Sequence, residues 1–295
     1  MEVEELLARN AELVEEFTKN HLSREGVPSL LWESVIYGAT GGKKLRASLL
    51  FATAKAYHVG EEEVLPLAAG IEMIHSFSLV HDDLPCMDND DFRRGKPSLH
   101  RAFGEAMGVL AGDALLVEGL RMFTENREFQ RAFGTRKTLA VLRVLLRALG
   151  NQGMVGGQVL DILYQGKEVS EREILDMYRR KTALFIQAAV LCGGILGSAS
   201  RREKTLLSRF GLLLGECFQM KDDLLDVTQE SARLGKTAGK DLVQGKATLV
   251  RVKGILETER MMEERFQKAC QVLEALPRDF SELLALSRFV ITRDR

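Results

Sequence analysis

Apolar side chains recur every three or four residues along most of this chain, which is the spacing of one buried face on an α-helix. Near the N-terminus Leu6, Leu13 and Phe17 lie among Glu and Arg residues, and this pattern predicts a surface helix over residues 3–22. A second helix is expected from Pro28 to Tyr37. Longer helical patterns follow over residues 64–83, 106–126, 138–149, 154–164 and 206–227, and amphipathic helices return after residue 248.

The period-two alternation that predicts β-strands is scarce, so the sequence indicates an all-α fold. A length of 295 residues would allow two domains, but the chain has only 5 prolines and no Ser-, Pro- or Gly-rich linker interrupts the helical pattern. We therefore expect a single domain over residues 1–295, organised as an antiparallel helical bundle. The hydrophobic content of 45% is sufficient for a large core.

The overall charge is balanced, with 41 basic and 42 acidic residues and a formal net charge of −1. No block of basic residues carries interleaved aromatics, so nucleic acid is not an expected partner. The first ten residues are acidic and amphipathic, unlike a signal peptide. The 4 cysteines show no CxxC spacing, which is typical of reduced thiols. These features predict a cytoplasmic protein.

The most apolar stretch, residues 184–199, is about 16 residues long and falls short of the roughly 20 that span a bilayer. It also contains Gln187 and three glycines. We expect a buried core or subunit-interface helix here, and no membrane insertion.

Five aspartates crowd into ten residues at the end of the predicted helix 64–83, namely Asp82, Asp83, Asp88, Asp90 and Asp91. Like charges this close raise one another's pKa, and carboxylates at a helix C-terminus oppose the helix dipole, so the cluster needs a cation. Mg²⁺ suits it, because this ion prefers oxygen ligands and keeps positions open for substrate phosphates. Arg93 and Arg94 follow at once and can grip phosphate oxygens. Together these residues predict a diphosphate substrate.

An unbroken helix would not gather these carboxylates. Asp88 lies six residues after Asp82, which is about 600° of rotation and leaves it roughly 120° from the same face. Pro85 removes a backbone donor and biases Leu84 away from helical dihedrals, so the chain can swing Asp88 back beside the first pair.

A second acidic cluster contains Asp222, Asp223 and Asp226. At this spacing Asp222 and Asp226 share one face of a regular helix, with Asp223 beside them. We expect the two clusters to face each other across a cleft and to hold metal ions between them.

Basic residues follow Gly41 and Gly42, and a Gly-Gly step of this kind can cradle phosphate. Lys43 and Arg46 would share a helical face at i, i+3, although a solvated loop is the commoner role of such a segment. His75 precedes Asp82 by seven residues and therefore lies on nearly the same helical face. A lone histidine on an apolar helix is, however, more often an ordinary core residue.

Two further segments leave their roles open. Gln158 and Asp161 are polar residues in apolar surroundings, and a structural hydrogen bond is as reasonable for them as a ligand contact. Residues 234–241 are Gly-rich and basic without an apolar period, which predicts a loop. Such a loop usually faces solvent, but next to a metal-diphosphate site Lys236 could fold over the phosphates.

Several of these motifs together resemble one family. Asp82-Asp83-Leu84-Pro85-Cys86-Met87-Asp88, followed by Arg93-Arg94-Gly95, resembles the first aspartate-rich motif of the trans-prenyl (polyprenyl) diphosphate synthases, and Asp222-Asp223-Leu224-Leu225-Asp226 resembles the second. Other landmarks stand in family order at residues 41–46, 110–113, 156–161, 181–182 and 235–237. The resemblance covers nearly the whole chain and is strongest to the bacterial farnesyl diphosphate synthase (geranyltranstransferase) branch. The family usually has Arg and Pro where this chain has Lys44 and Ala47.

The resemblance implies an isoprenoid-synthase helical bundle around a central cleft, a homodimer, and an enzyme that joins isopentenyl diphosphate to an allylic diphosphate. It implies two or three Mg²⁺ ions, with Mn²⁺ as a substitute, held by Asp82, Asp83, Asp88, Asp222, Asp223 and Asp226. It assigns isopentenyl diphosphate to Lys43, Arg46, His75 and Arg94. It assigns the allylic diphosphate and its ionisation to Arg93, Lys181, Thr182, Gln219 and Lys236, with Asp82 and Asp83 acting through the metal.

The chemistry expected of such a site is stabilisation of charge. Departure of diphosphate leaves a resonance-stabilised allylic cation, so metal ions and basic side chains that bind the leaving group carry most of the catalysis. No protein nucleophile is needed, and water must be excluded because it would quench the cation.

Product length should depend on the depth of the apolar wall below the metals. Phe77 lies five residues before Asp82, about 7.5 Å along the helix axis, with Ser78 beside it. An aromatic here resembles the farnesyl-producing bacterial members, so we expect a C15 product. An ordinary core role for Phe77 is the alternative, as is a geranyl or geranylgeranyl product.

Three other functions share some of these features. A class I terpene cyclase shares the metal chemistry but does not need the isopentenyl residues Lys43, Arg46 and His75. A metal-dependent phosphohydrolase would use the His81-Asp82 pair, but would leave the second acidic cluster without a role. A non-catalytic partner subunit is disfavoured because both aspartate clusters are intact.

Overall fold

The computed structural model describes residues 2–230 and 245–293. Over these residues the chain is built of helices, and two strands of two residues each are the only β-structure in that part of the chain. The predicted all-α class is confirmed. The chain divides into two compact units, Met1–Leu139 and Ala140–Arg295, and each is described by itself. The expectation of one domain over residues 1–295 stays a prediction.

The first unit contains six complete helices and a hairpin among its described residues. In chain order the elements are α1 (Val3–His21), α2 (Ser29–Ala39), α3 (Leu45–Ala56), α4 (Glu61–Asp82), β1 (Phe92–Arg93), β2 (Lys96–Pro97), α5 (Leu99–Phe103) and α6 (Glu105–Thr124). Helix α7 (Arg127–Leu149) begins in this unit and ends in the second, with a non-helical residue at Gly134.

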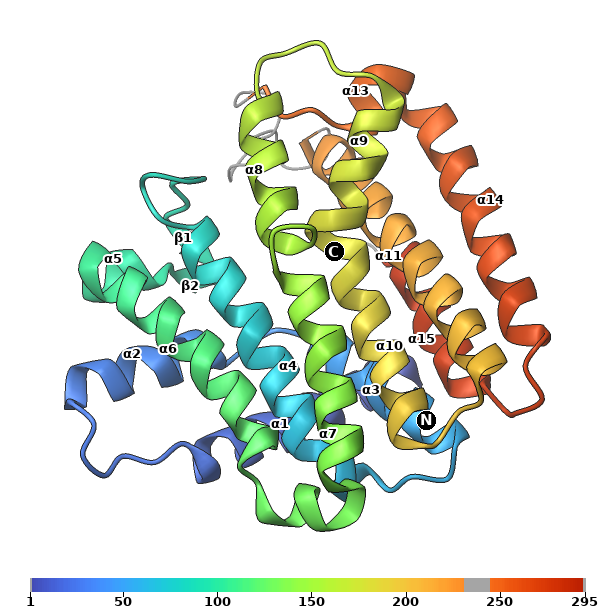
Figure 1. Ribbon diagram of the computed structural model, residues 1–295. Helices are drawn as coiled ribbons and strands as arrows, with labels where there is room; N and C mark the ends of the chain where they lie inside the picture. The colour runs from blue at the N-terminus through green and yellow to red at the C-terminus, as the bar shows by residue number, and fades with distance from the viewer. Residues whose placement is uncertain (1, 231–244, 294–295) are drawn as a thin grey trace. The chain divides into compact units, whose positions relative to one another are not determined.

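Helix α4 forms the core of the first unit. After a charged first turn, its residues are buried almost continuously from Val64 to Ile74. The backbone of α6 comes very close, because a Cβ on Gly70 would lie only 2.3 Å from the carbonyl oxygen of Gly119. The two helices therefore pack directly side by side (Figure 1). The carboxylates at the end of α4 are carried by an element that tight packing holds rigid.

Among the described residues, α4 is also the one helix long and apolar enough to cross a membrane. Its most apolar window is 72% buried inside the structure, as expected of a core helix. The apolar stretch 184–199 forms α10 (Leu184–Leu196), most of whose side chains are buried as well.

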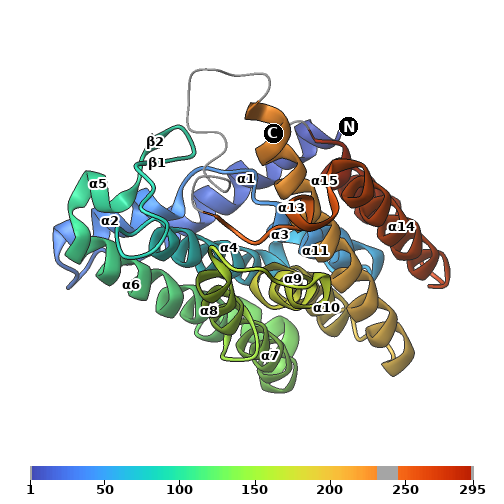
Figure 2. The same ribbon diagram turned by 90° about the horizontal axis from the view of Figure 1, so that it is seen from above.

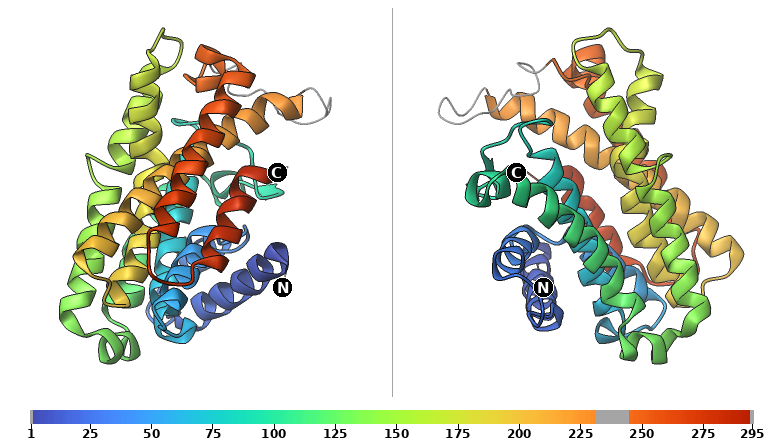
Figure 3. Two further views of the ribbon diagram at one scale, coloured as in Figure 1. Left: turned by 90° about the vertical axis from the view of Figure 1, so that its right-hand side faces the viewer. Right: turned by 60° about the vertical axis from the view of Figure 1, so that its left-hand side comes forward.

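The second unit is built around one long helix, α11 (Arg201–Glu230), with α10 and α14 alongside it (Figure 3). Its other described elements are α8 (Met154–Tyr164), α9 (Glu171–Tyr178), the π-helix η1 (Arg179–Ala183), α13 (Leu249–Lys253), α14 (Ile255–Glu274) and α15 (Ser281–Thr292). Glycines let η1 pack closely: a Cβ on Gly157 would lie 2.3 Å from the backbone nitrogen of Lys181, and one on Gly215 would lie 2.4 Å from Cα of Ala183.

Candidate functional site

The first acidic cluster lies at the C-terminal end of α4. Asp82 is the last helical residue and Asp83 is the C-cap. The chain then turns at Pro85, and the backbone N–H of Asp88 donates to the carbonyl oxygen of Asp82 at 2.8 Å, while that of Asp90 donates to Asp83 at 3.1 Å. The predicted break is confirmed, because Asp88 returns beside the first pair.

The hairpin that follows α4 carries the two arginines (Figure 2). Arg93 pairs with Lys96 in its register, and the two residues between them, Arg94 and Gly95, have φ angles of 54° and 77°. Two left-handed residues in a two-residue loop are the type I′ geometry that suits the twist of a hairpin. This turn sends neighbouring arginine side chains to different partners.

Arg93 binds the acidic cluster. Its Nε lies 3.1 Å and 3.2 Å from the two carboxylate oxygens of Asp83, and its Nη2 donates to the same carboxylate. Asp83 is only 2% exposed, so the carboxylate of this charge-assisted pair is shielded from water, while the Arg93 side chain is partly exposed. The hydrogen bond and the charge of Asp83 raise the pKa of Arg93 against the opposing effect of burial.

Arg94 instead lies over the glycine segment before α3. Its Nη1 donates to the carbonyl oxygen of Thr40 at 3.0 Å. A Cβ on Gly42 would lie 2.8 Å from Nε of Arg94, so any side chain here would displace this guanidinium. Gly41 and Gly42 both have φ above 80°, at 83° and 85°, which is a second reason for glycine here.

The helical face suggested for Lys43 and Arg46 does not exist, because α3 begins only at Leu45 and its N-cap, Lys44, is left-handed with φ 46°. Lys43 is exposed and Arg46 is buried. Lys44 is 3% exposed and donates from Nζ to the carbonyl oxygen of Ala39 at 2.6 Å.

Lys44, Arg46, His75 and Arg94 form a basic group. Burial and mutual repulsion shift the pKa values of its members Lys44 and His75. The pKa of His75 falls well below its ordinary value, first through burial and then through the charges of Arg46 and Arg94. Burial lowers the pKa of Lys44 to about 8, with Arg94 adding to the shift. The buried Nδ1 of His75 has no hydrogen-bond partner among the described residues. Cations gathered at such a cost favour binding of an anion.

Sequence reasoning missed Glu72, the counter-charge of this group. It is buried in α4, and its Oε1 accepts a hydrogen bond from the backbone N–H of Ala47 at 2.9 Å, in the first turn of α3. Its charge raises the pKa of Lys44 and of Arg94. The available signal was a single carboxylate inside an otherwise apolar helical run, since such groups are seldom buried without partners.

The lowered pKa of Lys44 predicts a pH dependence of stability. Between pH values of about 8 and 10.5 the unfolded chain keeps a proton on Lys44 that the folded chain has lost, so the free energy of unfolding rises with pH over this range. Relative to Lys44→Met, the wild type should gain up to about 3 kcal/mol across it. Urea denaturation at pH 7, 8, 9 and 10 measures the difference. A difference that stays constant with pH would contradict the assignment.

The second acidic cluster lies on α11, where Asp222 and Asp226 share a face as predicted because the helix is regular there. Asp222 forms an ion pair with Arg293, the C-cap of α15. The guanidinium of Arg293 also lies 4.2 Å from the ring centroid of Phe218, one turn before Asp222. Each acidic cluster therefore has one aspartate paired with an arginine, Asp83 with Arg93 in the first unit and Asp222 with Arg293 in the second.

The remaining polar residues of the second unit pair with one another. Lys181 in η1 donates to Asp161 of α8 at 2.5 Å, and Thr182 donates to Oε1 of Gln219 at 2.8 Å. Asp161 therefore has a structural partner. The buried Nε2 of Gln158 has no hydrogen-bond partner within residues 2–230 and 245–293. Lys236 lies outside the described residues.

Phe77 is half-buried on α4, and its ring meets that of His81 edge-on with centroids 5.0 Å apart. His81 in turn fills the space left by Gly112 of α6, where its Nε2 lies 3.1 Å from the carbonyl oxygen of Val109. Phe77 is therefore on the side of α4 that faces α6, about 140° around the helix from Asp82. Ser78 donates its hydroxyl to the carbonyl oxygen of His75 at 2.9 Å.

The donor set suits a hard divalent cation. All the predicted ligands are carboxylates, and the backbone hydrogen bond from Asp88 to Asp82 keeps two of them together. Within the described residues no three such side chains form a ready-made metal cluster. Mg²⁺ bound here would thus draw its remaining ligands from water and from substrate phosphates, as this ion commonly does.

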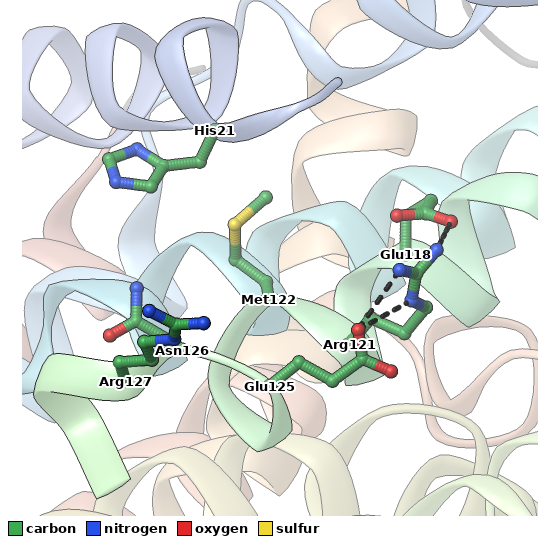
Figure 4. Close-up of a pocket in the computed structure, with 7 residues that line it drawn as sticks. All are labelled: His21, Glu118, Arg121, Met122, Glu125, Asn126 and Arg127. Atoms are coloured by element: carbon green, nitrogen blue, oxygen red, sulfur yellow. Dashed lines mark hydrogen bonds and ion pairs between the residues drawn. The ribbon is translucent and has the colours of Figure 1, made fainter. Parts of the chain in front are cut away.

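Described residues of the first unit line two of the hollows in this structure. One of about 20 Å³ lies beside Asp83, Arg93 and Arg94. The other, of about 290 Å³, contains none of the predicted site residues (Figure 4). In it Arg121 is neutralised by Glu118 and Glu125, both at 2.9 Å.

Comparisons with known proteins point in the same direction as this geometry. A family model described as "Polyprenyl synthetase" matches residues 28–283. The farnesyl diphosphate synthase of Bacillus subtilis (strain 168) is 34% identical over 289 residues, which are 98% of this chain and 97% of that protein. The chloroplastic geranylgeranyl pyrophosphate synthase of Catharanthus roseus is 38% identical over 270 residues, which are 90% of this chain and 75% of that protein.

Solved structures are similar over nearly their whole length. An FPP/GFPP synthase from Zymomonas mobilis has a TM-score of 0.87 at 28% identity, covering 98% of this chain and 99% of that one. The geranyltransferase of Helicobacter pylori, solved with magnesium and isoprenyl diphosphate, has a TM-score of 0.80 at 28% identity, covering 99% and 97%. From its fold, the order of its two acidic clusters and these similarities, the chain belongs to the polyprenyl synthetase family.

Proposed function

We propose that this chain is a Mg²⁺-dependent prenyltransferase that condenses isopentenyl diphosphate with dimethylallyl or geranyl diphosphate, head to tail, and releases (E,E)-farnesyl diphosphate. One observation carries the proposal. Three basic side chains, the buried Lys44 and Arg46 and the half-buried Arg94, lie around neutral His75, and the hairpin that carries Arg94 directly follows the acidic turn that begins at Asp82. A diphosphate site next to a metal site is the arrangement this reaction requires.

The basic group would hold isopentenyl diphosphate. Arg46 is buried at the start of α3, and neutral His75 can donate a hydrogen bond without adding to the repulsion around it. An incoming diphosphate would relieve the crowding of positive charge. Binding of the diphosphate, the non-reacting end of isopentenyl diphosphate, would position the double bond at the other end for attack.

Residues of the second unit would bind the allylic diphosphate. Lys181 is oriented by Asp161 and Thr182 by Gln219, so both enter the reaction preorganised. Mg²⁺, when bound by the aspartates, supplies the positive charge that stabilises the departing diphosphate. Arg93 can exchange Asp83 for a phosphate oxygen, because its guanidinium offers several donors.

The C15 product is the finer part of the proposal. The similar proteins include both farnesyl and geranylgeranyl synthases, so similarity does not choose between them. Phe77 favours the shorter product, because its large ring lies more than one turn before Asp82 on the side of α4 that faces α6. A homodimer in the cytoplasm is part of the same proposal. The exposed apolar side chains Val109, Leu110 and Val117 of α6 support an interface between two copies.

The proposal is tested by incubating the purified chain with dimethylallyl and isopentenyl diphosphates and Mg²⁺, then identifying the alcohols released by phosphatase. Farnesol as the main product supports it, and geranylgeraniol would correct the chain length. Phosphate release from nucleotides would favour a phosphohydrolase. A requirement for a second polypeptide would favour the non-catalytic subunit.

Arg46→Gln should separate the two substrates. Loss of a charge-assisted hydrogen bond costs about 1.5–3 kcal/mol, so the KM for isopentenyl diphosphate should rise about 10- to 100-fold while that for geranyl diphosphate stays near the wild-type value. Steady-state kinetics with each substrate varied in turn measures both constants. Arg101→Gln removes an exposed arginine of the same unit, paired with Asp91 at 2.6 Å, and should change neither. Equal increases in both constants would contradict separate diphosphate sites.

A further inference from the structure

The hydroxyl of Tyr178 connects three segments of the second unit. Tyr178 is the last residue of α9 and directly precedes η1, which carries Lys181 and Thr182. Its hydroxyl donates to Oδ2 of Asp223 on α11. The hydroxyl oxygen of Tyr178 also accepts a hydrogen bond from the backbone N–H of Leu249, the first residue of α13, at 2.8 Å.

Asp223 differs from its neighbours in the acidic cluster. It is turned about 100° from Asp222 around α11 and is only 3% exposed. Its Oδ1 accepts from Nε2 of Gln219 at 3.3 Å, and its Oδ2 accepts from the N–H of Leu249 at 3.3 Å as well as from Tyr178. A carboxylate saturated in this way is held in place by the protein.

These bonds extend to a predicted site residue, since Gln219 accepts from Thr182 at 2.8 Å. The hydrogen-bonded chain runs in the order Thr182, Gln219, Asp223, Tyr178 and Leu249. It crosses an apolar core that includes Met177, Met220 and Leu224. Buried polar groups in such a core need hydrogen-bond partners. Removing one member of this series would therefore leave its neighbours without a partner.

We propose that Tyr178 is a positioning residue: through Asp223 it fixes the second acidic cluster relative to η1 and to the start of α13. This rests on the proposed function for its consequence, because the cluster is taken to bind Mg²⁺ with diphosphate. Asp222 and Asp226 then remain to face the ligand, while Asp223 anchors the helix that presents them. Substitution of a residue that holds a metal ligand in place commonly lowers metal affinity or activity by about 10- to 100-fold.

The test is Tyr178→Phe, which keeps the ring and removes the oxygen. Hydrogen exchange of the full chain without substrates should show the Leu249 amide exchanging at least about tenfold faster, because the nearer of its two acceptors is gone and only the longer bond to Asp223 remains. Calorimetric titration with Mg²⁺ and pyrophosphate should show binding weakened about tenfold or more. The KM for isopentenyl diphosphate should not change. Tyr164→Phe removes a half-buried tyrosine hydroxyl at the end of α8 and serves as the matched control, with no expected effect.

A second variant keeps the test decisive if Tyr178→Phe folds poorly. Asp223→Asn should show the same weaker binding of Mg²⁺ and pyrophosphate, and the double variant should be no worse than the weaker single one. Wild-type exchange at Leu249 or wild-type affinity in Tyr178→Phe overturns the positioning role. Because the exchange measurement uses no substrate, failure to make farnesyl diphosphate would refute the proposed function without affecting this result.

Discussion

Asp82→Asn is expected to lower kcat for chain elongation by about 10²–10³-fold. Asp82 ends α4, and Asp88 is tied back to it through the backbone at 2.8 Å, so the two carboxylates act at one place. An amide of the same size preserves the fold but removes the negative charge that a hard divalent cation requires. The rate with geranyl and isopentenyl diphosphates at saturating Mg²⁺ measures the effect.

Asp91→Asn is the matched control. Asp91 belongs to the same acidic stretch, but it is exposed and pairs with Arg101 at 2.6 Å. Exposed pairs contribute less than about 1 kcal/mol, so this variant should keep nearly wild-type kcat. If both variants lost activity equally, the effect would come from the net charge of the stretch and not from Asp82 as a ligand.

Phe77→Ala is expected to change the main product from C15 to C20 or longer. The ring lies about 7.5 Å before Asp82 along α4, which is more than one helical turn, so removing it deepens the space available to a growing prenyl chain. The proposed reaction would stop where the prenyl chain meets the wall, so a deeper wall would permit a further addition of isopentenyl diphosphate. Chromatography of the alcohols released by phosphatase gives the product distribution.

Phe133→Ala controls for the loss of an aromatic ring. Phe133 is half-buried on α7, a different helix from α4. Its ring packs against that of Phe129, with the two centroids 4.9 Å apart. Its removal should reduce stability without altering product length. An unchanged C15 product in Phe77→Ala would assign Phe77 to the ordinary core and leave chain length to other residues.

Local signals in the sequence predicted much of the first cluster. Pro85 alone was enough to expect that the helix breaks and returns Asp88 to Asp82, because proline acts on its immediate neighbours. The range 154–164 matches α8 residue for residue, since glycine steps limit it. By contrast, α3 was not predicted, because almost all of its positions are buried and no polar face marks its period.

The missed features depend on partners far apart in the chain or on very short elements. Periodicity places Asp223 on α11 but does not reveal Tyr178, whose hydroxyl lies 45 positions earlier. The role of Glu72 depends on its hydrogen bond with the backbone N–H of Ala47, which lies 25 positions earlier in the chain. The hairpin has strands of two residues, and its Arg94-Gly95 turn lacks the Asn-Gly or Asp-Gly signature of such loops.

From the sequence we expect the two acidic clusters to bind one metal-diphosphate group jointly. A double-mutant cycle tests this directly: the Mg²⁺-dependent affinity for a non-reactive allylic diphosphate analogue is measured for the wild type, Asp82→Asn, Asp222→Asn and the double variant. Shared binding predicts an interaction energy of about 1 kcal/mol or more between the two substitutions. Losses that add within about 0.5 kcal/mol would show that the clusters act independently and would contradict the account.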